Sequence, residues 1–188
     1  MYVIDRLRPD EISDVAKIYE DSWKAAYRGI VPDGFLDEIV SDQWLPYLTE
    51  HPEASRVLRV DERPVATVSF GPARDTRRAS SVAVPVESGG IVSIYVRPEC
   101  LGKGYGTALL RQAVSELRSR GYERIYVWTL EKNHIARAFY EREGFAHKGN
   151  TVEIEIGGEK FVELRYEIDF RAEDAEDDEY DVPGLAQL

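Results

Sequence analysis

The sequence predicts a mixed α/β domain. Three patterns carry this prediction: a β-hairpin in the first half of the chain, a strand, helix and strand in the middle, and a second hairpin near the end. Short turns between strands give antiparallel pairs, whereas a helix between two strands allows a parallel crossover. The 188 residues are about one domain's worth of chain. We therefore expect one domain over residues 1–170.

The first half of the chain begins with a strand and a long helix. Residues 2–8 alternate between apolar and polar side chains, which is typical of a strand, and Pro9 ends it. Apolar residues then recur mostly at spacings of three and four up to Tyr27, which gives a helix one apolar face, and Gly29 stops it. The remaining elements expected in this half are two short helices over 33–39 and 43–49 and a hairpin of strands 56–60 and 65–70 around the turn 61–64.

The second half contains the crossover and the second hairpin. Residues 71–89 are rich in Gly, Pro, Ser and Arg, which predicts an irregular connection between strands. The elements expected after it are a strand over 90–96, a helix over 107–120, a strand over 125–130, a helix over 135–143, and a hairpin of strands 151–156 and 161–168 around Gly157 and Gly158. The acidic run 173–179 cannot pack, so residues 171–188 are expected to form a disordered tail.

Composition excludes several function classes. The formal net charge of −11 disfavours binding to nucleic acid, which needs a basic face. No apolar run approaches the roughly 20 residues that cross a bilayer, and the chain enters a strand without a signal-peptide profile. A soluble, cytoplasmic protein that does not bind membranes is expected. Cys100 is the only cysteine and the three histidines are scattered, so we expect no disulfide and no metal site.

The stretch 101–106, LGKGYG, has glycine, which lacks a side chain, at three alternate positions between a predicted strand and a predicted helix. Unpaired amides and the positive end of the helix dipole converge at such a point, and glycine lets an anion approach the backbone. Two nucleotide-binding loops do not fit: the dinucleotide fingerprint needs glycine at Thr107, and the P-loop needs Ser or Thr after Lys103. The spacing favours phosphate binding. The alternative is a tight turn without a ligand, although a turn usually needs one positive-φ residue.

Three stretches carry a family resemblance: LGKGYG at 101–106, NHIARAFYEREGF at 133–145 and SWKAAYRGIVP at 22–32. They resemble the GNAT acyltransferase superfamily, whose signature Gln/Arg-x-x-Gly-x-Gly/Ala is followed by a helix. Its second element is Asn-x-x-Ala-x-x-Phe-Tyr with Gly-Phe soon after. The resemblance covers roughly residues 1–168. It implies the GNAT fold, a central mixed and mostly antiparallel twisted sheet of about six to seven strands flanked by helices.

The resemblance implies acetyl-CoA, or a related acyl-CoA, as the acyl donor. Its pyrophosphate would lie on the amides that follow Leu101, and its pantetheine arm would pair like an extra strand with residues 94–96. Leu101 stands where the family usually has Arg or Gln, so one polar contact is missing while the amides remain. The residues that the resemblance assigns to the cofactor are Ile94, Tyr95, Val96, Gly102, Lys103, Gly104, Tyr105, Gly106, Thr107, Asn133 and Tyr140.

The resemblance makes Tyr140 the general acid towards the departing CoA thiolate. A phenol with a pKa of about 10 can hydrogen-bond to or protonate a thiolate whose thiol has a pKa of about 8.5. The nucleophile would be an amine, which is protonated at pH 7 and therefore needs a base. Gly90 and Trp128 occupy the strand positions where many family members have a glutamate, so the base is unassigned. Candidates, each of which can equally be a surface charge, are Glu87, Glu131 and an acid near Asp33.

The acceptor side of the site is expected on the first helix. Trp23 and Tyr27 lie four residues apart and so share one side, either as an acceptor wall, as in the family, or as core aromatics. This aromatic pair and the acidic composition favour a cationic amine acceptor, such as a polyamine, an aminoglycoside-like amine or a peptide amine.

The function expected is an N-acetyltransferase in which a bound amine attacks acetyl-CoA directly, without an intermediate on Cys100. The alternative is a non-catalytic acyl-CoA-binding sensor or regulatory module, which the missing base and Leu101 favour. The terminal hairpin also offers an edge strand through which two chains can form a homodimer.

Overall fold

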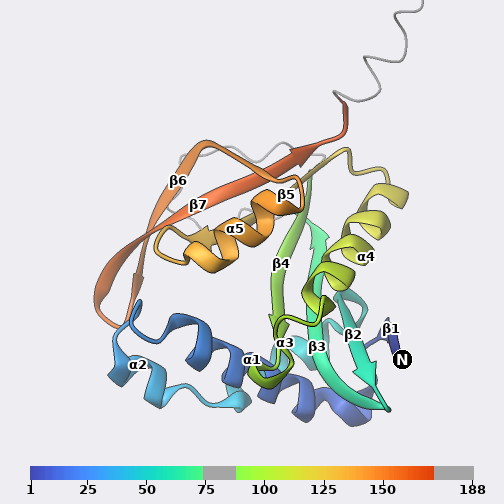
Figure 1. Ribbon diagram of the computed structural model, residues 1–188. Helices are drawn as coiled ribbons and strands as arrows, with labels where there is room; N and C mark the ends of the chain where they lie inside the picture. Colours follow the sequence, from blue (N-terminus) through green and yellow to red (C-terminus); the bar gives the residue numbers. More distant parts are fainter. Residues whose placement is uncertain (74–87, 172–188) are drawn as a thin grey trace, which may run out of the picture.

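A seven-stranded sheet forms the centre of the molecule (Figure 1). The computed structural model describes residues 1–73 and 88–171. The strand order is β1-β2-β3-β4-β5-β7-β6, and every neighbouring pair is antiparallel except β4 and β5, which are parallel. This sheet, flanked by helices, confirms the expected α/β fold class.

The elements follow the order that the sequence predicts. The strands are β1 (Tyr2–Arg6), β2 (Ser55–Val60), β3 (Arg63–Pro72), β4 (Ser88–Val96), β5 (Arg124–Leu130), β6 (Ala146–Ile156) and β7 (Glu159–Asp169). The α-helices are α1 (Ile12–Tyr27), α2 (Asp33–Glu38), α3 (Leu45–Glu50), α4 (Tyr105–Ser119) and α5 (His134–Arg142). Short 3-10 helices are η1 (Pro9–Glu11), η2 (Ser41–Trp44), η3 (Pro52–Ala54) and η4 (Pro98–Cys100). In the ranges 1–73 and 88–171, no helix has the length and apolarity to cross a bilayer.

Several boundaries differ from the prediction. The connection expected over 71–89 is shorter, because β3 extends to Pro72 and β4 begins at Ser88. The turn between β2 and β3 consists of Asp61 and Glu62, both at positive φ (50° and 62°), because the next residues already pair with β2. Two such residues match the right-handed twist of a hairpin. The acidic tail beyond residue 171 lies outside the described residues.

β4 and β5 form the part of the sheet that positions the site. They pair only over residues 88–91 and 124–127. At the same place the register between β3 and β4 shifts and leaves Val92 without a partner, which is a β-bulge that bends the strand. The rest of β4 therefore lacks a strand partner on its β5 side. The backbone of this edge can therefore pair with an extended ligand, which would lie beside β4 like an added strand.

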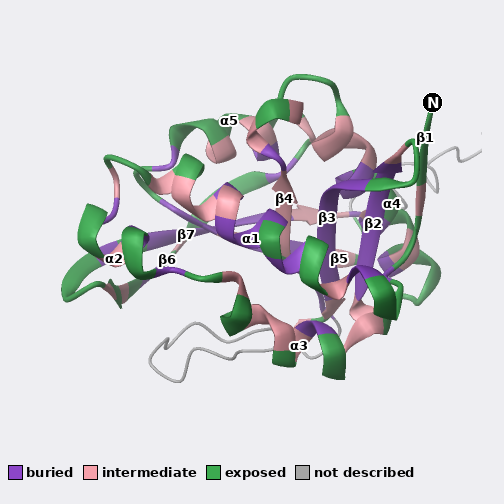
Figure 2. Cartoon of the chain, turned by 90° about the horizontal axis from the view of Figure 1, so that it is seen from below, coloured by how far each residue is buried: buried purple, intermediate pink, exposed green. Residues whose placement is uncertain are grey.

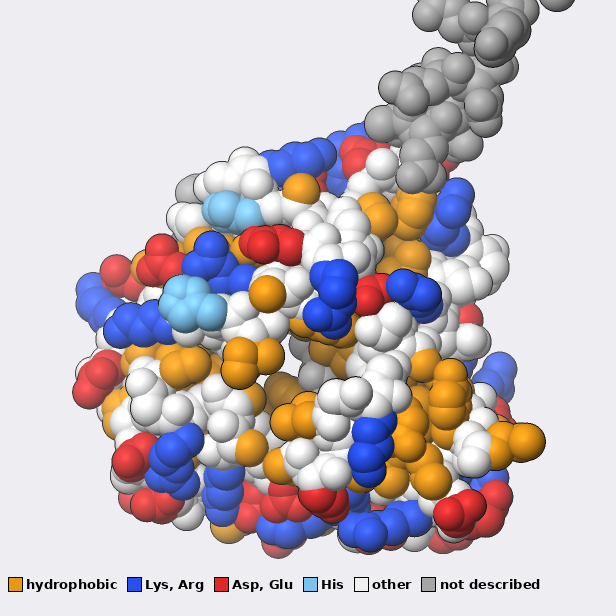
Figure 3. Space-filling model, viewed as in Figure 1, with side chains coloured by type: hydrophobic (Ala, Val, Ile, Leu, Met, Phe, Trp, Pro, Cys, Tyr) orange, Lys and Arg blue, Asp and Glu red, His pale blue; other side chains and the backbone are white. Residues whose placement is uncertain are grey.

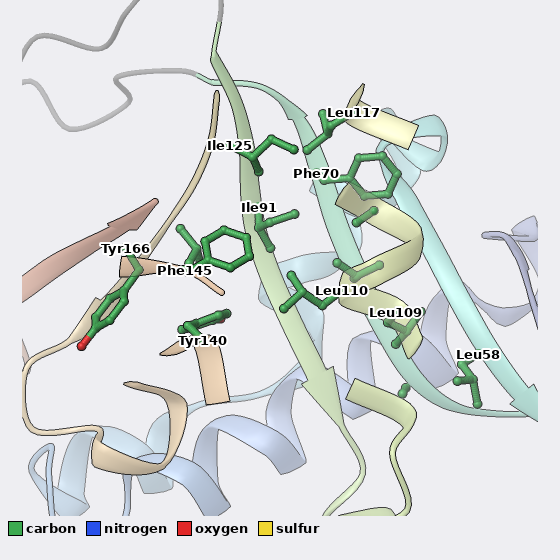
Figure 4. Close-up of a cluster of buried hydrophobic side chains, with 14 of the residues drawn as sticks. Leu58, Phe70, Ile91, Leu109, Leu110, Leu117, Ile125, Tyr140, Phe145 and Tyr166 are labelled. Atoms are coloured by element: carbon green, nitrogen blue, oxygen red, sulfur yellow. The ribbon is translucent and has the colours of Figure 1, made fainter. Parts of the chain in front are cut away.

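Helices cover both faces of the sheet. On one face α4 and α5 enclose the main apolar cluster, in which Figure 4 shows Leu110, Phe145 and Tyr140 around Ile91 of β4. On the other face α1 and α3 pack on β2 through a second cluster that includes Leu48. Figure 2 shows that β2 and β3, which lie between these layers, are buried along most of their length. The sheet thus separates two sides, with α4 and α5 on one and α1 to α3 on the other.

A buried ion pair fixes the start of α1 against β2. The Nε of Arg59, in β2, donates to Oε2 of Glu11 at 2.9 Å, and its second nitrogen donates to the other carboxylate oxygen and to the Arg6 carbonyl. Only 1% of the Arg59 side chain and 8% of the Glu11 side chain are exposed. Removing one partner of such a pair leaves the other charge buried without compensation.

Replacement of Glu11 by alanine should therefore destabilise the fold by about 3–5 kcal/mol. Urea unfolding followed by circular dichroism measures this. Glu62→Ala is the control, because Glu62 pairs with Arg8 at 3.1 Å but its side chain is 80% exposed, so its loss should change stability little. Equal losses in the two variants would contradict a special role for the buried pair.

Candidate active site

The glycine-rich loop joins β4 to α4. After η4, Gly102 and Gly104 adopt positive φ (75° and 80°), and Gly104 is the N-cap of α4. Other residues lose about 1–2 kcal/mol in this conformation. The turn itself therefore requires two of the three glycines, one more than the sequence argument allowed for a turn, and only Gly106 is unexplained by backbone geometry.

The backbone amides of residues 102–107 have no hydrogen-bond acceptor in the part of the chain that the structure describes. The first amide of this region with a partner is that of Ala108, which donates to the Gly104 carbonyl at 3.0 Å. The amino terminus of a helix carries a partial positive charge. The loop thus presents a row of free N–H donors at a positive helix end, an arrangement that suits phosphate.

Gly106 lies where α4, β4 and α5 meet. A Cβ at this position would lie 3.7 Å from the Phe139 ring and 3.7 Å from Cγ2 of Val96, which is ordinary van der Waals contact. The fold therefore tolerates a small side chain at Gly106, but that side chain would occupy the gap between β4 and α5. Glycine at this position fits the close approach of a ligand to the backbone.

The side chains of the loop mostly serve the fold. Tyr105 packs edge-on against an aromatic ring of β1 at a centroid distance of 5.8 Å. The hydroxyl of Thr107 donates to Oε1 of Glu143 at 2.9 Å. Lys103 is exposed and Leu101 is 62% exposed. The groups left for a ligand are the amides and the Lys103 ammonium.

The side chains of β4 alternate between the two faces of the sheet. Ile94 and Val96 pack against the cluster under α4 and α5. Tyr95 lies on the other face, where its ring is 4.7 Å from that of Tyr19 on α1. The backbone of Tyr95 is the register partner of Thr67 in β3, and its side chain lies on the α1 side of the sheet.

Asn133 is the N-cap of α5 and not its first helical residue. Its Oδ1 accepts a hydrogen bond from the Ala136 amide at 3.1 Å, and the residue is 7% exposed. Capping alone would favour asparagine here. Its side-chain nitrogen has no acceptor among residues 1–73 and 88–171, so it remains available to a ligand.

Tyr140 lies on α5 among aromatic rings and is 6% exposed. Its ring centroid is 5.2 Å from that of Phe139, 6.0 Å from Phe145 and 6.3 Å from Tyr166. Burial, together with the nearby phenol of Tyr27, raises the pKa of Tyr140 well above its ordinary value. The hydroxyl therefore stays protonated at neutral pH and can donate a hydrogen bond, while the raised pKa makes it a weaker acid than an ordinary phenol.

The aromatic residues of α1 contact β4 on the side of the sheet that faces away from α4 and α5. The rings of Trp23 and Tyr27 are 4.5 Å apart, which confirms that they share one side of the helix. The indole nitrogen of Trp23 donates to the Tyr95 hydroxyl at 2.8 Å. Both residues also pack against the cluster formed by α2 and the β6–β7 hairpin, as core aromatics do.

The surface is hollowed where these elements meet. Figure 3, in the view of Figure 1, shows a hollow bounded by α5, β4 and α1. A cavity of about 480 Å³ lies where β4 and β5 begin to separate, and Gly90, Val92 and Trp128 line it. His51 and Glu53, beside α3, contribute to its wall.

The candidate bases are not enclosed in this region. Asp33 pairs with Arg28 at 3.1 Å and its side chain is 65% exposed. Glu131 follows β5 and is exposed, and Glu87 lies outside the described residues. Over residues 1–73 and 88–171, no three His, Cys, Asp or Glu side chains gather as metal ligands would.

A group of hydroxyls escaped the sequence analysis. Ser55, Ser69 and Ser93 are direct cross-strand neighbours on β2, β3 and β4. The Tyr19 hydroxyl lies 2.8 Å from Oγ of Ser69 and 2.9 Å from Oγ of Ser93, and the Ser55 and Ser69 oxygens are 2.9 Å apart. Burial raises the pKa of Tyr19 to about 12. No motif joins these residues in the sequence, because only strand register brings them together.

Comparison with known proteins agrees with this geometry. Residues 14–145 match the sequence profile of the Acetyltransferase (GNAT) family. YuaI, an uncharacterized N-acetyltransferase of Bacillus subtilis (strain 168), is 27% identical over 144 residues, which are 71% of this chain and 74% of YuaI. The spermidine N(1)-acetyltransferase of Thermoplasma acidophilum is 19% identical over 166 residues, 87% of this chain and 97% of that protein.

Solved structures share the fold at lower identity. The PaiA N-acetyltransferase of Thermoplasma acidophilum, solved in complex with coenzyme A, superposes with a TM-score of 0.67 at 15% identity. The superposition covers 90% of this chain and 99% of the PaiA chain. The family profile spans most of the chain, from α1 to the residue before β6. The chain therefore belongs to the Acetyltransferase (GNAT) family and is an acyltransferase.

Proposed function

We propose that the chain transfers an acetyl group from acetyl-CoA to a primary amine of a small molecule or peptide. The amine attacks the donor directly while both are bound, and the chain carries no acyl group. The observation that carries the proposal is the row of free amides over residues 102–107, which meets the unpaired edge of β4 at the start of α4. A diphosphate and an extended arm, the two parts of CoA, fit these two features.

The residues present fit CoA. The amides of 102–107 would hold the pyrophosphate, and the backbone of 94–96 would pair with the pantetheine arm as an added strand. The exposed ammonium of Lys103 would add a positive charge, and the side-chain nitrogen of Asn133 would add a donor to the arm. Leu101 supplies no polar contact. The CoA complex of the PaiA structure supports this choice of donor.

Acetyl-CoA supplies an activated acyl group in the form of a thioester. Tyr140 would hold a proton on its hydroxyl oxygen for the thiolate that leaves. Burial raises the pKa of Tyr140, so this proton stays in place at neutral pH. The apolar rings around Tyr140 would keep water from the leaving sulfur.

The acceptor would approach from the α1 side of the sheet. Trp23 and Tyr27 would form its wall, and the cavity beside Gly90 and Trp128 would give it access to the separation of β4 and β5. The acidic composition and the spermidine N(1)-acetyltransferase relative support a cationic amine. The net charge of −11 supports an acceptor other than nucleic acid.

A second candidate is a non-catalytic acyl-CoA sensor. The observation in its favour is that the strand positions Gly90 and Trp128 carry no carboxylate, and that Glu53, which does line the cavity, has a side chain that is 70% exposed. Acetyl-CoA turnover, followed by release of the free thiol across polyamines, amino acids, aminoglycosides and peptides, tests the two against each other. Turnover that depends on one amine supports the transferase. Tight binding of acetyl-CoA without turnover by any amine supports the sensor.

Two further properties belong to the proposal. Residues 1–170 would form a single transferase domain of a cytoplasmic enzyme. β6 is an edge strand of 11 residues, and two chains could pair through it in a homodimer. Sedimentation of the full chain tests the second property.

Gly106→Ala should separate cofactor binding from folding. The melting temperature should stay the same or rise, because alanine is more favourable than glycine in a helix by up to about 1 kcal/mol. Binding of acetyl-CoA should weaken at least about tenfold, because the methyl group enters the gap between β4 and α5. Calorimetry and thermal unfolding measure the two effects. Gly104→Ala is the matched control, because alanine at a φ of 80° should lower the stability. An unchanged affinity of Gly106→Ala for acetyl-CoA would refute the assignment of Gly106 to the cofactor site.

Tyr140→Phe should reduce kcat by roughly 100-fold, because the general acid is lost, and should leave the acetyl-CoA dissociation constant nearly unchanged. Thiol release and calorimetry measure these values. Tyr122→Phe is the control, since Tyr122 packs on the same cluster just before β5 and has no assigned role. Equal turnover in the Tyr140 and Tyr122 variants would remove Tyr140 from the mechanism.

A further inference from the structure

The hydroxyl group of Ser93 lies at the end of a hydrogen-bonded row that begins deep in the sheet. The order of the row is Ser55, Ser69, Tyr19 and Ser93, with oxygen separations of 2.9, 2.8 and 2.9 Å. Ser55 and Ser69 are fully buried, whereas Ser93 is partly exposed. Ser93 is also the first residue of β4 beyond the bulge, where β4 has already left β5. One end of the row is therefore closed and the other opens at the separation of β4 and β5.

Counting protons gives this row a direction. Each of the four hydroxyls has one proton, and the three hydrogen bonds use three of them, so one hydroxyl keeps a proton that no other member of the row accepts. If Ser93 donated inwards, that unused proton would lie on Tyr19, Ser69 or Ser55. It would then be buried, because these three residues are at most 3% exposed and their hydroxyls have no further partner in the described ranges. An unsatisfied buried donor costs about 1–3 kcal/mol.

The favoured direction thus runs outwards. Ser55 donates to Ser69, Ser69 to Tyr19, and Tyr19 to Ser93. The Ser93 hydroxyl accepts from Tyr19 and turns its own proton towards the open end of the row. Burial, which raises the pKa of Tyr19 to about 12, keeps the central phenol protonated as this direction requires.

Tyr95 presents a second proton on the same side. Its hydroxyl accepts a hydrogen bond from the indole nitrogen of Trp23 at 2.8 Å, and an indole can only donate. The phenol proton of Tyr95 is therefore not used in this contact. Burial raises the pKa of Tyr95 well above its ordinary value, so the proton is retained. Ser93 and Tyr95 are two residues apart on one strand, which places both side chains on the same face.

This face is the one opposite to the cofactor side. Ile94 and Val96, which alternate with Ser93 and Tyr95, pack towards α4 and α5. Within residues 1–73 and 88–171 neither O–H group has an acceptor, and both lie on the α1 side, from which the acceptor would approach. A ligand bound there meets donors that lack acceptors.

We propose that Ser93 and Tyr95 select an amine that carries an oxygen acceptor close to its nitrogen, such as an amino acid, a peptide amino terminus or an amino alcohol. This inference rests on the proposed acetyl transfer. The reacting nitrogen must keep its lone pair for the carbonyl carbon, so the Ser93 proton goes to another atom of the acceptor. A carbonyl, carboxylate or hydroxyl oxygen accepts it.

Because Ser93 and Tyr95 present hydrogen-bond donors, they disfavour a polyamine as the acceptor. At neutral pH the remaining nitrogens of a polyamine are protonated donors, and they need carboxylates or carbonyl oxygens as partners. The Ser93 and Tyr95 oxygens each accept one hydrogen bond already, from Tyr19 and Trp23, and with one lone pair left they offer these nitrogens less. The acceptor that these two O–H groups favour therefore differs from the polyamine that the acidic composition of the chain suggests.

The test compares matched acceptors and matched variants of the full chain. Ethanolamine is compared with propylamine, L-lysine with cadaverine, and trialanine with spermidine, by thiol release from saturating acetyl-CoA. The wild type should prefer the oxygen-bearing member of the pairs. Ser93→Ala should lower kcat/KM for oxygen-bearing acceptors by roughly 3- to 10-fold, the value of one hydrogen bond, and should leave that for the plain amines unchanged.

Two variants keep the test independent of folding. Ser93→Thr retains the hydroxyl and should retain the preference. Tyr19→Phe keeps Ser93 but removes the donor that orients it, so it should weaken the preference. Ser119→Ala, at an exposed serine at the end of α4, is the control for the substitution itself.

The outcomes separate this inference from the proposed function. A preference for cadaverine and spermidine, or a Ser93→Ala variant that treats both classes as the wild type does, overturns the inference while acetyl transfer stands. Acetyl-CoA binding without turnover of any amine overturns the proposed transfer, and the inference with it. A preference for oxygen-bearing amines that falls in Ser93→Ala and returns in Ser93→Thr supports the inference.

Discussion

The separation of β4 from β5 is the constraint on which the site depends. The two strands pair over four residues each and then diverge at the bulge of β4. Tyr140 and Phe145 belong to the apolar cluster that also holds Ile91 and Ile125 from the paired part of these two strands, so the α5 region packs next to the point where the strands diverge. A fully paired sheet would offer neither an edge for an extended ligand nor a connection between its two faces.

Arg97 fixes the position of α1 relative to the sheet. It follows β4 directly, and its Nε donates to the Pro64 carbonyl at 2.9 Å while a second nitrogen lies 3.4 Å from the Asp14 carbonyl. Its remaining nitrogen is 3.7 Å from Asp21. The Ser22 hydroxyl adds a bond from α1 to the Val96 carbonyl at 3.1 Å. These contacts fix α1, with Trp23 and Tyr27, relative to the strand and the loop that face the cofactor side.

The polar groups of the site differ in how they are supported. The amides of 102–107 have no acceptor in the described ranges, because a helix begins there and the first four N–H groups of a helix lack an intrahelical partner. Ser93 and Tyr95 are held by hydrogen bonds from Tyr19 and Trp23, so their orientation depends on the packing of α1. Tyr140, the proposed acid, lies among aromatic rings, where burial and the nearby phenol of Tyr27 raise its pKa and keep it protonated. The site thus combines local backbone geometry with contacts between distant segments.

The sequence by itself determined what depends on local patterns. Apolar spacing gave the helices and strands in the right order, and LGKGYG with NHIARAFYEREGF indicated the family, because a phosphate loop and its following helix are contiguous. Boundaries failed where partners decide them: Pro72 is a strand residue because it pairs with Gly89 of β4, and Ser88 because it pairs with Arg124 of β5. Asn133 could be read as a ligand contact from its motif, whereas the fold also uses it as a helix cap. The serine row and the free protons of Ser93 and Tyr95 needed the tertiary structure, because strand register and burial, not sequence proximity, set the hydrogen bonds of a sheet.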